Sequence, residues 1–294
     1  MLARIHKFNK ETKEAVMLVK HILVPVDFSE SSISGLNAAC EIARKFGAKL
    51  HLVNAFHVPT PAADLGGAPQ VVNTFISEYK EEIFDSLEAL KEHVPLLNRV
   101  DHDESVYVAS TLDAIYTAIE VKSIDLIVMG TRKTHSGFEH LLGGISTDVI
   151  QFAKCPVLVI PEQVQSFEPK TITLAVDYKN FKGLEKLNIV ADIARIYDAA
   201  VTIVHIDPSD QPEPAEQVDE MTELTQIFEG VDYKFEIAHG TKIKDRLINF
   251  IDENHIDMVV MMPRKHDLFQ RIFEGSVTKK VAIDVHIPLL AVHE

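Results

Sequence analysis

The sequence predicts an α/β protein made of two tandem Rossmann-like domains, each an open, parallel, five-stranded sheet with helices on both faces. The first observation behind this prediction is a long internal repeat, in which segment 36–46 returns as 187–197 and segment 124–133 returns as 256–265. The second is that the apolar runs are nearly continuous, which is typical of strands covered by helices on both faces. Repeats of such long period indicate a duplicated domain, because solenoid repeats are shorter.

In the first copy, strand and helix patterns alternate, which predicts parallel strands joined by right-handed crossovers. Apolar residues spaced three and four apart identify the helix after the first strand: Ile33, Leu36, Cys40 and Ala43. The apolar runs predict strands at 20–26, 49–56, 105–109, 125–129 and 156–160. Helices are expected at 31–46, 69–93, 111–122 and 144–153.

The second copy repeats this pattern, and its equivalent helix stripe is Leu184, Leu187, Ala191 and Ala194. Its strands are expected near 171–176, 201–206, 232–237, 257–261 and 288–292. The offset between equivalent residues falls from 151 to 132 along the chain, so the first copy carries about nineteen extra residues. The copies differ in length mainly before the second helix, around the Pro/Gly/Ala-rich loop at 57–68, which is either a lid over a ligand or a solvated flap.

The repeat also sets the expected domain bounds. These are an N-terminal extension at 1–18, a first domain at 19–162, a linker at 163–170 and a second domain at 171–294. The extension has no counterpart in the second copy, and Met17 is a candidate alternative start.

Composition excludes several kinds of partner. The formal net charge is −15 and no Lys/Arg run occurs, which argues against nucleic acid or an anionic membrane, since both need a basic surface. No apolar stretch reaches the roughly 20 residues that span a bilayer. The two cysteines, Cys40 and Cys155, lie in apolar segments without metal-ligand spacing, so no disulfide or metal site is expected and a cytoplasmic location fits.

The candidate ligand site lies at the carboxyl ends of the strands, where open parallel sheets bind ligands. In the first copy three strands end there, at Pro25-Val26-Asp27, Asn54-Ala55 and Met129-Gly130. The segment 143–147, Gly-Gly-Ile-Ser-Thr, stands directly before a helix. Glycines admit a phosphate close to the backbone, and the helix end supplies free N–H groups and a positive dipole. The same Ser or Thr is equally an ordinary N-cap.

Three segments give the chain a resemblance to the universal stress protein family, in tandem form, over all but about the first sixteen residues. They are Ile22 to Ser29, Asp125 to Gly130, and Cys155 to Pro161. The resemblance implies that some of the edge residues line an adenine pocket and that others surround the ribose and phosphates. The residues expected at this nucleotide site are Pro25, Asp27, Ala55, Met129, Gly130, Lys133, Gly143, Gly144, Ile145 and Ser146.

The chain departs in part from the family's nucleotide motif, which is a Gly, a second Gly three residues on, and ten further on a Gly followed by Ser or Thr. Here the first falls on Gly130 and the third on Gly143. The second is replaced by Lys133, whose ammonium group either contacts a phosphate or is solvated. The hydroxyl position is Gly144, and Ser146 lies two residues further on.

The second copy departs further from that motif. Met262 stands at the first glycine position, where its side chain would fill space that the ribose and phosphates need. Asp177 and the pair Gly275 and Ser276 remain, so a degenerate second site is expected.

The remaining motifs do not indicate catalysis. There is no Gly-x-Ser-x-Gly elbow, no Walker loop and no histidine pair at zinc spacing, so an enzyme is not expected. The basic pair Arg132-Lys133, repeated as Arg264-Lys265, is either anion-facing or solvated. His205, on an apolar strand, is expected to be a hydrogen-bonded core residue.

The sequence therefore predicts a stress-response regulatory protein whose first domain binds an adenine nucleotide, ATP with Mg²⁺. The alternative is a scaffold of the same fold that binds no nucleotide and acts through its surface, through protein partners or through another small ligand. The resemblance further implies that closing strands 156–160 and 288–292 pair edge to edge, which would relate the two halves by a pseudo-two-fold axis as an intra-chain pseudo-dimer. Homodimer formation by the whole chain stays open.

Overall fold

The computed structural model describes residues 19–58, 69–132, 144–176, 183–207, 218–240, 243–262 and 286–293. Within them the backbone forms two compact units. The first unit comprises residues 19–132 and 144–167, and the second begins at residue 168. Residues 1–18 of the expected extension and residues 59–68 of the long loop lie outside the described residues, and the predicted domain bounds stay predictions.

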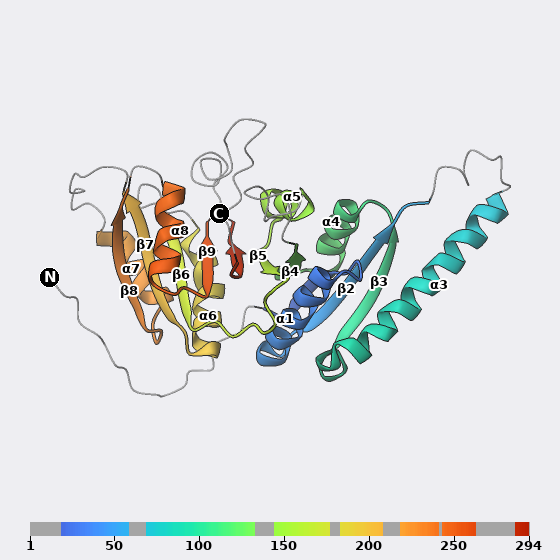
Figure 1. Ribbon diagram of the computed structural model, residues 1–294, viewed down its shortest axis with the longest axis horizontal. Helices are drawn as coiled ribbons and strands as arrows, with labels where there is room; N and C mark the ends of the chain where they lie inside the picture. The colour runs from blue at the N-terminus through green and yellow to red at the C-terminus, as the bar shows by residue number, and fades with distance from the viewer. Residues whose placement is uncertain are drawn as a thin grey trace. The chain divides into compact units, whose positions relative to one another are not determined.

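The first unit is a parallel five-stranded sheet in the order β3-β2-β1-β4-β5, with helices in the crossovers (Figure 1). Its strands are β1 (His21–Pro25), β2 (Lys49–Phe56), β3 (His102–Val108), β4 (Leu126–Thr131) and β5 (Val157–Pro161). Its helices are α1 (Glu30–Phe46), α3 (Pro69–His93), the 3₁₀ helix η1 (Pro95–Arg99), α4 (Thr111–Lys122) and α5 (Gly144–Phe152).

The second unit repeats this topology, with a parallel sheet in the order β10-β9-β6-β7-β8. Its strands are β6 (Thr171–Val176), β7 (Ala200–Asp207), β8 (Tyr233–His239), β9 (Met258–Met261) and β10 (Leu289–Ala291). Its helices are the 3₁₀ helix η2 (Leu184–Leu187), α6 (Asn188–Tyr197), α7 (Val218–Ile227) and α8 (Ile243–Glu253). The predicted fold class, two α/β units with parallel five-stranded sheets, is confirmed.

The central strands are buried on both faces, as their continuous apolar sequences predict. Every residue of β5 and of β9 is buried. The predicted helix stripes are core as well, since Leu36 and Leu187 are both fully buried. Cys40 and Cys155 are buried free thiols, and burial raises the pKa of each to about 12.

Strand β3 begins three residues earlier than the sequence predicts. It is the edge strand of its sheet, and all but its last residue are only half-buried. Its first residues, His102, Asp103 and Glu104, are polar, so they escape a search for apolar runs. The register is set by pairing with β2, in which Asp103 lies opposite His51.

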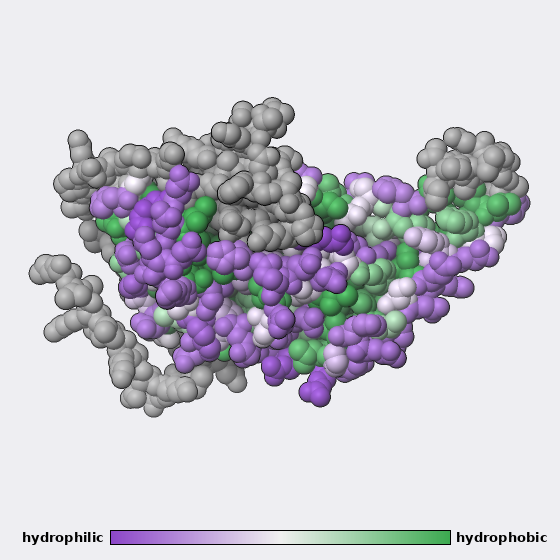
Figure 2. All heavy atoms as spheres, viewed as in Figure 1, coloured by the Kyte–Doolittle hydropathy of each residue, from purple (hydrophilic) through white to green (hydrophobic). Residues whose placement is uncertain are grey.

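Helix α3 lies along β3. Its exposed apolar residues include Val71, Tyr79 and Phe84, and apolar surface is visible on this helix in Figure 2. The ring of Tyr79 packs edge-on against Phe56 at the end of β2, with a centroid distance of 4.7 Å. The first half of α3 therefore borders the carboxyl edge of the sheet, next to Ala55.

The repeated Ile-Asp motif has a structural role in both units. In the first, the carboxylate of Asp125 accepts hydrogen bonds from the backbone N–H groups of Lys20 and His21, at 2.8 and 2.9 Å. In the second, Asp257 accepts from Lys170 and Thr171 in the same way, at 2.9 and 3.0 Å. Each aspartate thus satisfies the backbone donors where the unit's first strand begins.

Thr173→Val is expected to raise the free energy of unfolding of the second unit by about 1 kcal/mol. Thr173 is fully buried in the middle of β6, and its hydroxyl has no hydrogen-bond partner among the residues that the structure describes. Valine keeps the shape and removes the unpaired polar group, and the equivalent position in the first unit is the apolar Leu23. Chemical denaturation measures the change, and hydrogen exchange at the β6 amides assigns it to the second unit. A loss of stability would contradict the assignment of this hydroxyl as unpaired.

Two expectations concern the whole molecule. The pairing of the closing strands, and the pseudo-two-fold axis it implies, depend on how the units are placed relative to one another and stay predictions. In the part of the chain that the structure describes, no helix combines the length and the apolar character that a bilayer span requires.

Candidate functional site

Asp27 lies in the turn that joins β1 to α1. Its carboxylate accepts hydrogen bonds from the backbone N–H of Ser29, at 3.0 Å, and from the Ser29 hydroxyl. Ser29 in turn caps α1 by accepting from the N–H of Ser32, at 3.3 Å. Between them Phe28 has a φ of 63°, in the left-handed region that side-chain-bearing residues rarely adopt. Such strain is concentrated at binding and active sites.

The surroundings of Asp27 keep it ionised. Burial raises the pKa of this carboxyl, but hydrogen bonds from Ser29 and Ser32 and the nearby charge of Arg132 outweigh burial and hold the pKa below its ordinary value. Arg132 follows β4, so the structure brings it to the same edge of the sheet. An exposed carboxylate and a guanidinium group therefore flank the carboxyl ends of β1 and β4.

Gly130 is required for packing. A Cβ atom built at this position would lie 1.6 Å from the carbonyl oxygen of Ser31 in α1. A Cβ atom on Gly35, one turn further along α1, would lie 2.6 Å from the backbone nitrogen of Gly130. The two glycines thus let the helix and β4 meet backbone to backbone, whatever else Gly130 contacts.

The second unit lacks this glycine pair, and its helix begins differently. The equivalent positions hold Lys186 and the half-buried Met262. Where α1 is continuous, the second unit has the 3₁₀ helix η2 followed by α6 from Asn188. Without two glycines the helix and strand cannot approach as closely, which accounts for the different start.

The amino end of α5 is accessible. Gly144 is exposed, a Cβ atom built on it would lie more than 4 Å from every described atom outside its own helix turn, and Ile145 is 43% exposed. Ser146, by contrast, is buried, and its expected place at the nucleotide site stays a prediction. The first backbone N–H groups of α5 face the same carboxyl edge as Asp27, since α5 follows β4 in the chain.

Asn54 is a residue of this edge that the site prediction omitted. Its side-chain N–H donates to the carbonyl of Val26, at 2.8 Å, while its Oδ1 is buried and has no hydrogen-bond partner in the described part of the chain. In the second unit His205 occupies the same place, and its Nδ1 donates to the carbonyl of Val176, at 3.2 Å. His205 is therefore the hydrogen-bonded core residue predicted. Aligning the two copies would have drawn attention to both positions.

Some of the other predicted residues are described by the structure and others are not. Pro25, Ala55 and Met129 are strand residues within the first unit, next to the edge that Asp27 and Gly130 occupy. Five predicted residues lie outside the described part of the chain: Lys133, Gly143, Asp177, Gly275 and Ser276. Among the described residues, no three histidine, cysteine or acidic side chains gather as metal ligands.

The sequence profile of the Universal stress protein family matches residues 18–161 and again residues 169–293. The chain belongs to this family, in tandem form. Universal stress proteins from Methanocaldococcus jannaschii and Bacillus subtilis are each 30% identical to it. The alignments span 151 and 148 residues, which are 49% and 47% of this chain and 82% and 97% of those proteins. Each relative thus matches about the length of one copy.

Solved structures of universal stress proteins share the fold over nearly the whole chain. One from Archaeoglobus fulgidus superposes with a TM-score of 0.69 at 16% identity, covering 93% of this chain and 98% of that one. A universal stress protein structure from Pseudomonas aeruginosa gives a TM-score of 0.56 at 18% identity, with 94% of each chain covered. At such identities the likeness shows the tandem α/β architecture.

Proposed function

We propose that this chain is a stress-response regulatory protein of the cytoplasm, whose first unit binds ATP with Mg²⁺ and whose second unit holds a degenerate site. The observation that carries the proposal is the carboxyl edge of the first unit. There an ionised Asp27, the charge of Arg132 and the accessible amino end of α5 come from three successive parts of one sheet edge.

These groups match the parts of a nucleotide. The Asp27 carboxylate accepts hydrogen bonds from an amine or a ribose hydroxyl, and the unpaired Oδ1 of Asn54 beside β1 is a further buried acceptor. The N–H groups and dipole of α5, together with Arg132, favour the negative charge of phosphates. The role is regulatory, since the sequence carries no catalytic motif that would position a water.

Calorimetric titration of ATP and AMP, with Mg²⁺, into the nucleotide-free protein tests the proposal. We expect micromolar binding to one site. Gly144→Trp is expected to weaken it by at least about tenfold, or 1.4 kcal/mol, because the indole would stand over the amino end of α5. Gly144→Ala is the matched control and should bind like wild type, since a methyl group has room there. Equal binding by all three proteins would remove the nucleotide from this edge.

A non-nucleotide scaffold is the second candidate, and the half-buried Met262 at the end of β9 favours it for the second unit. Its thioether occupies the position that glycine holds in the first unit. Absence of heat with either nucleotide, and no nucleotide carried through purification, would assign the whole chain to this class.

A further inference from the structure

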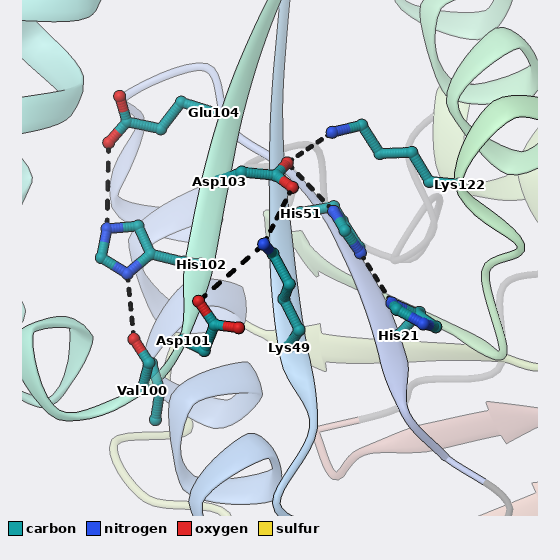
Figure 3. Close-up of polar contacts among 9 residues, drawn as sticks. All are labelled: His21, Lys49, His51, Val100, Asp101, His102, Asp103, Glu104 and Lys122. Carbon is teal, nitrogen blue, oxygen red and sulfur yellow. Dashed lines mark hydrogen bonds and ion pairs between the residues drawn. The ribbon is translucent and has the colours of Figure 1, made fainter.

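A chain of polar side chains crosses the first sheet at the end opposite to the candidate site (Figure 3). His21 begins β1, His51 lies in β2, Asp103 in β3, and Lys122 ends α4. The Nδ1 atom of His21 lies 3.0 Å from Nε2 of His51, and Nδ1 of His51 lies 3.0 Å from Oδ1 of Asp103. The same Asp103 oxygen accepts a hydrogen bond from Lys122. We call these four residues the relay.

The bonding partners fix where the hydrogens lie. Asp103 is ionised: burial raises its pKa, but hydrogen bonds from Lys122 and His51 outweigh burial and lower the pKa to about 2. A carboxylate only accepts, so Nδ1 of His51 carries a hydrogen. In neutral His51 the other nitrogen, Nε2, then carries no hydrogen and accepts, so His21 must donate to it from Nδ1.

One added proton leaves this contact intact, and two do not. If His21 takes the proton, its Nδ1–H still donates to His51. If His51 takes it, Nε2–H donates to a bare Nδ1 of His21. When both rings are charged, two N–H groups face each other across 3.0 Å and no acceptor remains between them.

We propose that the relay is a proton-responsive latch, which holds β1 to β2 while the two histidines share at most one added proton and releases them when both are charged. The latch is part of the first unit and is independent of nucleotide binding. It makes the amino-terminal edge of β1, β2 and β3 sensitive to acidification.

The groups around His51 support this behaviour. The ring is only 5% exposed, and burial is the main reason why its pKa is lowered; the charges of Lys122 and His21 act in the same direction, against Asp103. Lys49, two residues away on β2, also pairs with Asp103, at 3.4 Å. Across the described residues, Asp103 is the only acid bonded to His51.

The other charged and titratable groups near the relay interact with partners outside it or with Lys49. Asp125 accepts from the backbone at the start of β1, and exposed Asp101 lies 3.8 Å from Lys49. His102 flanks Asp103 in β3 and lies 4.0 Å from Glu104. Side chains of adjacent strand residues point to opposite faces, so His102 and Glu104 lie across the sheet from the relay. Protonation of His102 beside Glu104 would strengthen that contact, whereas protonation of both His21 and His51 would break the contact between them.

The fold does not require the relay. In the second unit the positions of His21 and His51 hold Thr171 and Thr202, and Lys234 stands opposite Thr202 where Asp103 stands opposite His51. The same strands pair in the same register without a histidine. The second unit therefore supplies the matched substitutions, His21→Thr and His51→Thr.

The direction in which stability changes with pH follows from the lowered pKa of His51. A histidine that is harder to protonate when folded contributes stability that is present above its unfolded pKa of about 6.5. That stability is lost as the pH falls from about 6.5 toward the lower, folded pKa. Asp103 stays ionised throughout this range, so the change belongs to the histidines.

The test is hydrogen exchange of the β1 and β2 amides in the full chain between pH 7.5 and 5, corrected for intrinsic rates. We expect protection to fall by about tenfold for each pH unit below about 6.5, the slope for uptake of one proton on opening. His51→Thr should abolish this slope, and the control His102→Gln should retain it. An equal slope in wild type and His51→Thr would overturn the proposal.

Imidazole ¹⁵N spectra of the wild type provide a second measurement that needs no stable variant. We expect His51 to carry its hydrogen on Nδ1 at pH 7.5, and the doubly charged pair to accumulate only together with the loss of β1–β2 protection. The two threonine variants assign the signals. Two fully charged rings with protection unchanged would refute the latch.

Discussion

Gly130→Ala is expected to lower the free energy of unfolding of the first unit by more than about 3 kcal/mol, or to prevent the unit from folding. The added methyl group would lie 1.6 Å from the carbonyl oxygen of Ser31. That oxygen belongs to the first turn of α1, so no side-chain rotation relieves the overlap. The helix and β4 would have to separate along the line where Gly35 now meets Gly130.

Gly144→Ala is the control for this prediction, because both glycines belong to the expected nucleotide site. Within the described residues, a methyl group at Gly144 meets nothing within 4 Å, and alanine is favoured over glycine in a helix interior by about 1 kcal/mol. We expect this variant to be as stable as wild type or slightly more so. Denaturant unfolding with hydrogen exchange in β1 and β4 measures both variants. If Gly130→Ala proved as stable as Gly144→Ala, the backbone contact would be refuted.

The contrast bears on how the family's glycine motif is interpreted in this chain. Gly130 is explained by packing alone, so its presence is weak support for nucleotide binding. A Cβ atom at Gly144 would meet no atom of the described residues within 4 Å, and its exposed backbone at the start of α5 is better support. Loss of binding in a Gly130 variant would report a damaged fold, which is why the binding test uses Gly144.

Much of the fold was predictable because it depends on local patterns. Continuous apolar runs located the central strands, and three-and-four spacing located α1 to within a residue. The repeat gave the second unit. The missed start of β3 shows the limit, since an edge strand with polar residues is defined by its pairing with β2 and not by its own hydrophobicity.

The site was predictable only in part, because its chemistry depends on distant contacts. Asp27 and the start of α5 could be placed from strand ends and a glycine segment. The role of Asn54 depends on a carbonyl 28 residues away, and the relay depends on the register that sets His51 beside both His21 and Asp103. No spacing in the sequence shows such a juxtaposition, although differences between the copies at 51 and 202 mark where to look.

The second large effect is expected at the two repeated aspartates. Asp125→Ala should lower the free energy of unfolding of the first unit by about 2 to 3 kcal/mol, because two backbone N–H groups at the start of β1 lose a charged acceptor. Asp257→Ala should do the same to the second unit, where the carboxylate has equivalent partners. Hydrogen exchange resolved by unit measures each loss separately.

Asp101→Ala is the matched control at the same edge of the first sheet. Its carboxylate is 75% exposed and, among the residues that the structure describes, pairs only with Lys49, at 3.8 Å, so its loss should change stability by no more than about 0.5 kcal/mol. A clear difference between Asp125 and Asp101 would show that backbone capping, and not edge charge in general, is what the duplicated motif provides. If the two aspartates of the motif proved as dispensable as Asp101, hydrogen bonding to the backbone N–H groups at the strand start would not explain why they recur in both copies.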